Sequence, residues 1–414
     1  MSQIGAGAAG IGPGLRRFLA LSPADGPSWR DIGLADGNGP ALSRAATMLT
    51  DDPDVYGSLG SGALAAGDHQ YAGRHLHRAL ALQPGRADLL QLTSHWSYCR
   101  RNAGEAACWA RRALALDPSF VAARRSLHFA DLLGGNITSG AAALGVHLRA
   151  IPTVPLPLWH GEPLSGRSLL VVGEEGFGDM IQMARFLPLV ARTGVRVTVV
   201  VPSVLRRLFA SIAGITVAVE ASPAQFDAWI PMMALPAAMP HVLGSRLPNL
   251  PYLVPPATGP DLAASTQFTV GLTWKGRPSH PFDRRRSLTP QLLSPLLAVP
   301  GIRFVSLDPE NALAPLLAVP QSDFADTAFL MSRLDLVISV DTASAHLGGA
   351  LGVPTWVLVA DMPEWRWGAG GRSSLWYPSA RLYRCPTPSA WPDVVAAVAH
   401  DLTLLASQGT IAAT

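Results

Sequence analysis

A strand–helix–strand pattern between Leu334 and Pro354 constrains the fold of this chain more than any other feature. Leu334–Val340 is short, apolar and β-branched, which predicts a buried strand. Ala343–Leu351 predicts a helix, closed by a glycine and then a proline, and Thr355–Val359 is another apolar run. Such a unit belongs to an open parallel sheet, in which ligands collect beyond the carboxyl ends of the strands.

Polar residues lie at the junction between this strand and its helix, namely Asp341, Thr342, Ser344 and His346. A helix start offers N–H groups and the positive end of the helix dipole, which together suit a phosphate. The alternative is that Asp341 and Thr342 only cap the helix, and that His346 is a satisfied histidine at an interface. The pattern alone leaves both interpretations open.

An internal repeat occupies the first third of the chain. Residues 78–84 read RALALQP and residues 112–118 read RALALDP, an offset of 34 residues. This period is typical of a tetratricopeptide array, whose small residues let paired helices approach. Residues 41–152 are therefore predicted to form an all-α solenoid, after a flexible tail over residues 1–40. The array either binds a partner in its groove or only packs against the rest of the chain.

Composition excludes several classes of function. The chain has 414 residues, 49% of them apolar and 15% charged, which indicates a globular protein of more than one domain. A net charge of +3 does not indicate a nucleic-acid partner. The three cysteines lack the spacing of a zinc site or a disulfide framework. We find no convincing secretory signal and no unbroken apolar span, and therefore expect a cytoplasmic protein with no membrane span.

A glycine turn opens a second α/β half. Ser168–Val172 predicts a strand, residues 174–179 read EEGFGD, and Met180–Thr193 predicts an amphipathic helix. The turn lacks the third glycine of a dinucleotide fingerprint, and no acidic residue ends the next strand, so NAD is not expected. Asp179 therefore caps the helix, faces a different ligand, or does both.

A basic loop follows another predicted strand, Thr269–Trp274. Lys275 ends the strand, and residues 276–287 read GRPSHPFDRRRS. Charge runs are usually solvated surface, but the position directly beyond a strand's carboxyl end favours a site for an anion. Lysine would bind a phosphate as a point charge, and one of the arginines as a fork.

These segments together resemble bacterial glycosyltransferases related to the heptosyltransferases (family 9-like), in a form fused to tetratricopeptide repeats. The resemblance covers residues 158–405 in order. It rests on the D-T-x-x-x-H-x-x-x-A-x-G-x-P string that starts at Asp341 and on the G-[LMF]-G-D turn that ends at Asp179. It implies the α/β GT-B fold of two Rossmann-like halves, with an acceptor half over residues 158–256 and a donor half over residues 265–408.

The resemblance also implies roles for individual residues. Asp179 is the expected general base, which takes the proton of an acceptor hydroxyl as that hydroxyl attacks the sugar. The transfer is expected to invert the anomeric centre, with cationic side chains in place of a metal, so neither a metal nor a cofactor is expected. The residues expected to bind a nucleotide-sugar donor are Gly178, Lys275, Arg284, Arg285, Arg286, Asp341, Thr342, Ser344 and His346.

The remaining expectations concern aromatic residues and partners. Trp365, Arg366 and Trp367 either stack on a base or sugar or pin the two halves together. The repeats are expected to bring the acceptor, a protein such as a flagellin or else a glycan. The alternative function is a non-catalytic scaffold, because Arg277 stands where relatives often carry asparagine, and because the adjacent Gly348 and Gly349 should loosen their helix.

Overall fold

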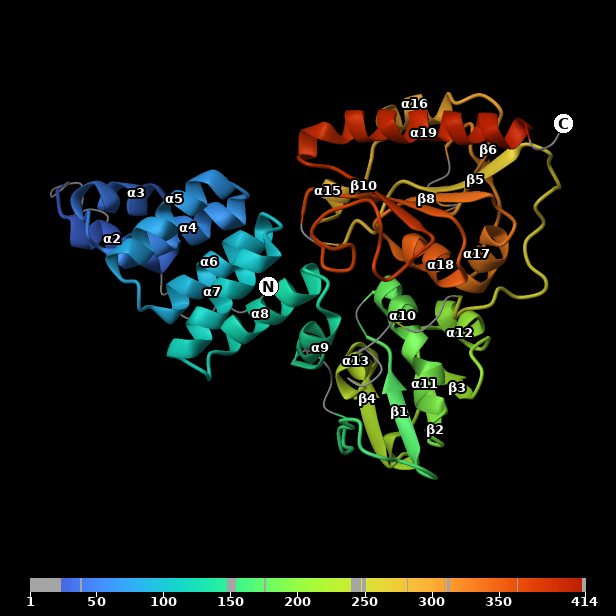
Figure 1. Cartoon of the computed structure of the whole chain (residues 1–414), viewed down its shortest axis with the longest axis horizontal. Coiled ribbons are helices and arrows are strands. Elements are labelled where there is room, and N and C mark those ends of the chain that lie inside the picture. The colour runs from blue at the N-terminus through green and yellow to red at the C-terminus, as the bar shows by residue number, and fades with distance from the viewer. Residues whose placement is uncertain are drawn as a thin grey trace. The chain divides into compact units, whose positions relative to one another are not determined.

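The computed structural model describes most of the chain (Figure 1). The described residues are 24–37, 39–146, 154–174, 176–239, 247, 251–280, 282–308, 310, 313–362 and 364–411. The chain divides into two compact units, Met1–Gly134 and Gly135–Thr414. Most of the predicted tail, residues 1–23, lies outside the described residues.

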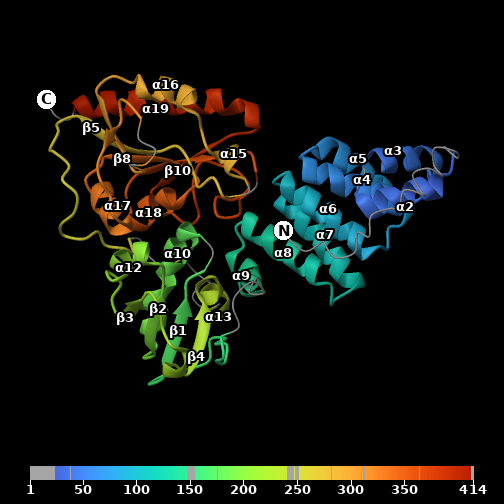
Figure 2. The ribbon, with the colours of Figure 1, turned by 180° about the vertical axis from the view of Figure 1, so that it is seen from behind.

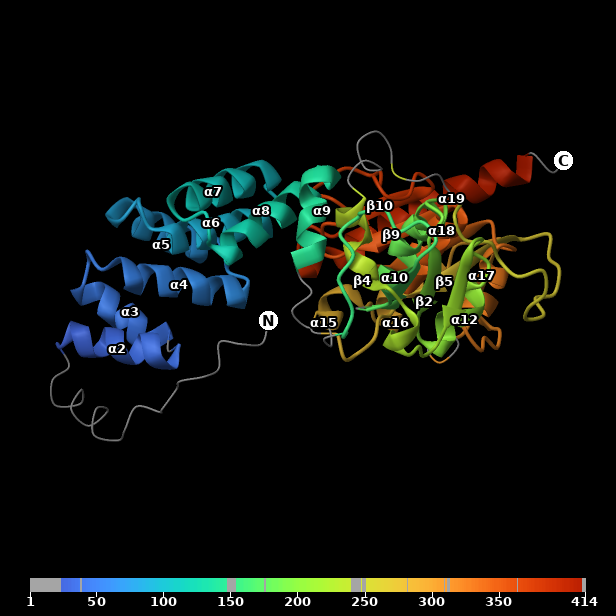
Figure 3. The same ribbon diagram turned by 90° about the horizontal axis from the view of Figure 1, so that it is seen from below.

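The first unit is a succession of packed helices, which follow one another in Figure 3. Aspartate and asparagine side chains open three of them: Asp52, Asp68 and Asn102 each accept a hydrogen bond from a backbone N–H in the first turn. The helices are α2 (Gly26–Asp36), α3 (Gly39–Met48), α4 (Pro53–Ala66), α5 (His69–Leu82), α6 (Ala87–Cys99), α7 (Ala103–Leu116) and α8 (Val121–Leu133). An all-α N-terminal region is confirmed.

The boundaries of this region differ from the predicted ones at both ends. Residues 26–36 form α2, which packs against α3, although they were predicted to belong to the tail. A proline near the start of α2 and a left-handed Gly37 at its end define this helix locally. Helix α9 (Ile137–Val146), predicted to lie in the array, belongs to the second unit and packs against α13 (Leu235–Ala238).

The second unit contains two all-parallel sheets, seen from behind in Figure 2. The first has the order β3-β2-β1-β4, and the second has the order β10-β9-β8-β5-β6-β7. Two parallel sheets that follow an all-α region along the chain confirm the predicted fold class. The strands are β1 (Ser168–Val172), β2 (Arg196–Val200), β3 (Ile215–Ala218), β4 (Ala228–Pro231), β5 (Phe268–Thr273), β6 (Ile302–Ser306), β7 (Leu317–Ala318), β8 (Leu336–Val340), β9 (Thr355–Val359) and β10 (Ala380–Arg384).

Helices cover these sheets, because parallel strands need crossover connections. In the first half they are α10 (Phe177–Met183), η2 (Ala184–Phe186), α11 (Leu187–Ala191), α12 (Ser203–Phe209), η3 (Pro223–Gln225), η4 (Met232–Ala234) and α13. In the second half they are α15 (Asp283–Arg286), α16 (Pro290–Leu297), α17 (Phe324–Met331), α18 (Ala343–Leu351), η6 (Pro388–Ala390) and α19 (Trp391–Ile411). No described helix is both long enough and apolar enough to span a bilayer.

Two predicted elements of the second unit are corrected in detail. The single helix predicted over Met180–Thr193 is divided into α10, η2 and α11, because Pro188 lies in the first turn of α11 and has no N–H to continue the ladder. The strand predicted from Leu334 begins at Leu336, and all of its residues are buried. A strand buried on both faces reads as a continuous apolar run.

Side chains from both halves meet around a buried arginine. Arg185, in η2, is 1% exposed, and its Nη1 donates to the carbonyl oxygen of Trp376 at 3.0 Å. Its guanidinium lies over the rings of Tyr252, Trp376 and Tyr377. In addition, Arg207 of α12 pairs with Asp323 and Asp326 at the start of α17. These contacts join the first half to the second.

Two glycines of α4 provide a matched test of the predicted helix packing. A Cβ on Gly60 would lie 2.6 Å from Cγ of the fully buried Leu76, whereas a Cβ on Gly62 would meet nothing within 4 Å. We expect Gly60→Ala to destabilise the protein by about 1–3 kcal/mol through overpacking. Gly62→Ala should stabilise it by up to about 1 kcal/mol, the helix propensity of alanine over glycine. Urea unfolding followed by circular dichroism measures both, and equal effects would contradict the packing.

Candidate active site

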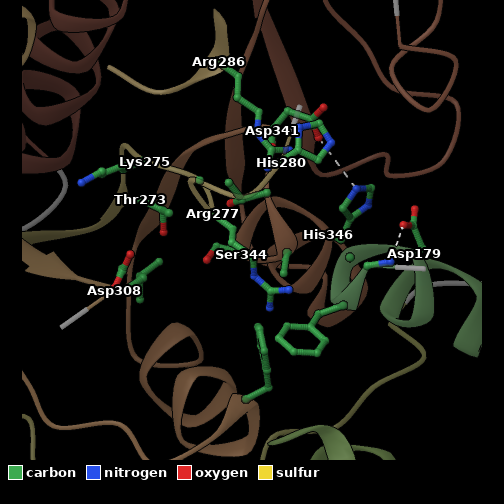
Figure 4. Close-up of a pocket in the computed structure, with 18 of the residues that line it drawn as sticks. Asp179, Thr273, Lys275, Arg277, His280, Arg286, Asp308, Asp341, Ser344 and His346 are labelled. Carbon is green, nitrogen blue, oxygen red and sulfur yellow. Dashed lines mark hydrogen bonds and ion pairs between the residues drawn. The ribbon is translucent and has the colours of Figure 1, made fainter. Parts of the chain in front are cut away.

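A cleft of about 1050 Å³ lies between the two halves of the second unit. It is lined by the first turn of α10, the loops after β5, β6 and β9, and the starts of α17 and α18. Each of these segments follows the carboxyl end of a parallel strand. The cleft therefore occupies the place where open α/β sheets bind ligands (Figure 4).

Asp179 lies in the first turn of α10 and lines this cleft. One of its carboxylate oxygens, Oδ2, accepts the backbone N–H of Gly176 at 3.0 Å. The other, Oδ1, forms an ion pair with Arg366 of the second half. The two interpretations left open by the sequence are therefore compatible, because Asp179 caps its helix and also faces the cleft.

Gly178 lets α10 approach α18 closely. A Cβ at this position would lie 2.7 Å from Cδ2 of His346 and 3.4 Å from the Cα atom of Ala343. Real Cβ atoms essentially never approach another atom to 2.7 Å, so a side chain here would push the two helices apart. Gly178 thus has a steric role in the walls of the cleft.

His346 is held by contacts on three sides. Its Nδ1 is 2.9 Å from the hydroxyl of Tyr377, its Nε2 is 3.9 Å from a carboxylate oxygen of Asp341, and its ring stacks on Trp367. Burial, together with the positive charge of Arg366, lowers the pKa of His346 to about 3. The imidazole is therefore neutral near pH 7, and it joins the cleft to the packed interior.

The environment of Asp341 makes its carboxyl group harder to ionise than that of an exposed aspartate. Burial raises the pKa of Asp341 to about 6, and the negative charge of Glu364 adds to this effect. Trp367 and the cations Arg286 and Arg366 partly offset the rise. A carboxyl group with a raised pKa in a cleft is a common property of functional sites.

The start of α18 contributes backbone and hydroxyl groups to the cleft. The side chain of Thr342 does not cap the helix, and its hydroxyl instead lies 3.1 Å from that of Ser339. Ser344 is buried and lines the cleft in the first turn. The side chain of Thr342 thus does not cap α18 as the alternative predicted, and the positive end of the helix faces the cleft.

The structure separates the three arginines of the basic loop. Arg286 lines the cleft, and its Nη1 donates to the backbone carbonyl of Asp341 at 2.8 Å. Arg285 also lines the cleft but forms an ion pair with Asp361. Arg284 is exposed and is not among the lining residues. Lys275 and Arg277 also line the cleft, so the cations of this loop that face it are Lys275, Arg277, Arg285 and Arg286.

Trp365 and Trp367 do not line the cleft, contrary to the hypothesis that they stack on a ligand. Trp365 is 5% exposed and packs against Trp376, and Trp367 is 2% exposed and packs between His346 and Tyr377. Their large apolar surfaces are buried inside the protein. These ring contacts lie within the second half, so the alternative that the two tryptophans pin the halves together stays a prediction.

Three functional candidates were missed by the sequence analysis: Arg185, Glu364 and Tyr377. Arg366 was expected to stack on a ligand or to pin the halves together, but its ion pairs with Asp179 and Glu364 were not predicted. No pattern in the sequence could indicate that Arg185 is buried, because its partners lie 67 and 191 residues away.

No protein-family model matches this chain. A curated protein, Protein FlbA of Caulobacter vibrioides, is 27% identical over 291 residues, which are 60% of this chain and 48% of FlbA. The chain therefore spans about half the length of the curated relative that it matches. Similarity of this extent does not assign the chain to a family.

Solved structures similar to this chain include glycosyltransferases. The O-GlcNAc transferase of Thermobaculum terrenum is 17% identical, with 96% of this chain and 92% of that chain covered and a TM-score of 0.32. The heptosyltransferase TibC of enterotoxigenic E. coli, in complex with ADP-D-beta-D-heptose, is 12% identical, with 61% and 78% covered and a TM-score of 0.40. These TM-scores are low, and the fold assignment rests on the strand order given above.

The expectation that no metal or cofactor takes part is corrected by these comparisons, because TibC is an iron-containing enzyme. Within the part of the chain that the structure describes, no group of three or more His, Cys, Asp or Glu side chains is arranged to hold a metal ion. The described residues therefore do not offer a side-chain cluster that fits iron.

The raised pKa of Asp341 predicts how stability depends on pH. Unfolding lowers this pKa to about 3.9, so the folded state binds the proton more tightly. The resulting stabilisation is present below about pH 4 and is lost as the pH rises through about 6. We expect Asp341→Asn to become more stable than the wild type between pH 4 and 7, by about 2–3 kcal/mol at the upper end.

Thermal melting of both proteins from pH 4 to 7 measures this difference. His346 titrates in both proteins, so the comparison largely removes its contribution. Asp261→Asn, which removes an exposed carboxylate that does not line the cleft, provides the control. A constant difference between Asp341→Asn and the wild type across this range would contradict the raised pKa.

Proposed function

We propose that this protein is a glycosyltransferase that moves a sugar from a nucleotide-sugar donor to a protein or glycan acceptor. The observation that carries this proposal is the cleft, where the carboxylate of Asp179 from one half faces the cations and the helix start of the other half. A base and an anion site on opposite walls suit a transfer from a diphosphate leaving group.

The donor half supplies the groups that would bind the diphosphate. Lys275 and Arg286 line the cleft from the segment after β5, and Arg285 lines it while paired with Asp361. Residues Thr342 and Ser344 lie at the start of α18, whose dipole favours negative charge. Together they would stabilise the charge that develops on the departing nucleoside diphosphate.

The acceptor half supplies the base. As the acceptor oxygen attacks the anomeric carbon, its proton passes to Asp179, and the bond between that carbon and the diphosphate oxygen breaks. Attack from the side opposite the leaving group inverts the anomeric centre. Base assistance of this kind contributes about 10²–10⁴-fold to the rate.

The repeats are proposed to recruit the acceptor. Helices α4 to α8 form an array of the kind that binds extended partners in a groove.

The second candidate function, a scaffold with a degenerate enzyme half, has one observation in its favour: both carboxylate oxygens of Asp179 are engaged by other groups of the protein. The cations that line the cleft favour the enzyme.

Thermal melting with nucleotides tests the donor site without an acceptor. We expect one of UDP, GDP, ADP or CMP, or a sugar derivative, to raise the melting temperature. A ligand at about 100 times its Kd stabilises the protein by about 2.7 kcal/mol. Lys275→Ala and Arg286→Ala should lose this shift, because each removes a cation from the cleft.

Arg284→Ala is the matched control, because it removes the same charge from an exposed position of the same loop. It should retain the nucleotide shift in full. If no nucleotide raises the melting temperature at millimolar concentration, the enzyme proposal is wrong and the scaffold function is favoured. Equal loss in Arg284→Ala and Arg286→Ala would mean that the shift reports only the net charge of the loop.

A further inference from the structure

One arginine joins two carboxylates across the cleft. Arg366 lies in the loop between β9 and β10, and its side chain is 16% exposed. Its Nη2 forms an ion pair with Asp179 of the first half, and its Nη1 forms one with Glu364 at 2.6 Å. The guanidinium also lies over the ring of Trp365, with 4.3 Å between the Cζ atom and the ring centroid.

These contacts fix the carboxylate of Asp179 at both oxygens. The backbone N–H of Gly176 holds Oδ2, and Arg366 holds Oδ1. A carboxylate offers about four acceptor positions, so two remain for another donor such as a hydroxyl. Because both oxygens are held, the plane of the carboxylate is set, and with it the direction in which the remaining lone pairs point.

The charges around Arg366 support this arrangement. Burial alone would lower the pKa of Arg366, but the carboxylates of Asp179 and Glu364 raise it above its ordinary value. Arg366 therefore stays a guanidinium. Glu364 also raises the pKa of Asp341, so the pair of Arg366 and Glu364 influences acidic residues from both halves of the cleft.

We propose that Arg366 is a positioning residue that holds the Asp179 carboxylate in one orientation in the cleft, and that Glu364 and Trp365 hold Arg366 in place. The role in catalysis rests on the proposed function, in which Asp179 is the base. The hold itself does not depend on that function. A guanidinium suits the task because its fork reaches two carboxylates at once, whereas a lysine presents a single point charge.

Carboxyl labelling tests the hold without any ligand. Carbodiimide and glycine ethyl ester modify accessible carboxylates, and peptide mass spectrometry measures the rate at each residue. We expect Asp179 to be labelled at least three times faster in Arg366→Gln than in the wild type. Glu364→Gln removes one of the groups that hold Arg366, so its Asp179 should be labelled at a rate between those of the wild type and Arg366→Gln.

Labelling at Asp401, which pairs with Arg381 on the outside of the second sheet, reports whether a variant has unfolded. If Arg366→Gln unfolds, Asp401 is labelled faster as well, and Arg366→Lys then serves as the test, with Asp179 expected to be labelled faster than in the wild type. An unchanged rate at Asp179 in a folded Arg366 variant would overturn the proposal.

Kinetics test the positioning role. The reaction is hydrolysis of the nucleotide sugar that gives the largest melting shift, with Asp179→Asn as the inactive reference. We expect Arg366→Ala to lower kcat by 10–100-fold and to change the donor KM by less than threefold. Millimolar ethylguanidinium should restore part of kcat in Arg366→Ala but not in Asp179→Asn, an effect that a general loss of structure would not show.

Other kinetic results would overturn the positioning role. A rise in KM with unchanged kcat would make Arg366 a donor-binding residue, and a rise in kcat would mean that Arg366 restrains the base. If the wild-type protein hydrolyses no nucleotide sugar, the proposed function fails. The labelling experiment alone then decides whether Arg366 holds Asp179.

Discussion

The close approach of helices α10 and α18 is the constraint on which the cleft depends. It requires Gly178, because any side chain there would meet the ring of His346. His346 in turn is fixed by Tyr377 and Trp367, so it cannot move aside without disturbing the packed interior. Since the helix that carries Asp179 meets the helix that follows Asp341 at this point, the contact sets how near the two carboxylates lie.

Buried charge reinforces the same junction. Arg185 reaches from the first half into the aromatic cluster of Tyr252, Trp376 and Tyr377, where it donates to a carbonyl oxygen and lies against three rings. Arg366 reaches in the other direction, from the second half to Asp179. A guanidinium suits both positions, since it is weakly hydrated, always charged and able to donate several hydrogen bonds in one plane. Each arginine ties one half of the cleft to the other.

The acidic side chains of the cleft have different electrostatic environments. Asp179 is engaged by a cation and a backbone N–H, whereas burial and Glu364 raise the pKa of Asp341. His346, buried between them, is neutral near pH 7. An arrangement in which neighbouring titratable groups have different environments is what acid–base chemistry requires. Because these groups act on one another's charge, removing one of them is expected to change the ionisation of the others.

The sequence by itself determined the elements and the edge of the sheet at which the site lies. Ala343–Leu351 and Thr355–Val359 have the predicted bounds, because apolar periodicity and helix stop signals are local. It placed Asp179 at a helix start and Lys275 and Asp341 at strand ends, and these residues line one cleft. Only the tertiary structure decided which arginines face the cleft, that Trp365 and Trp367 are buried, and that Arg366 holds Asp179. Those outcomes depend on contacts between residues far apart in the chain, which no local pattern encodes.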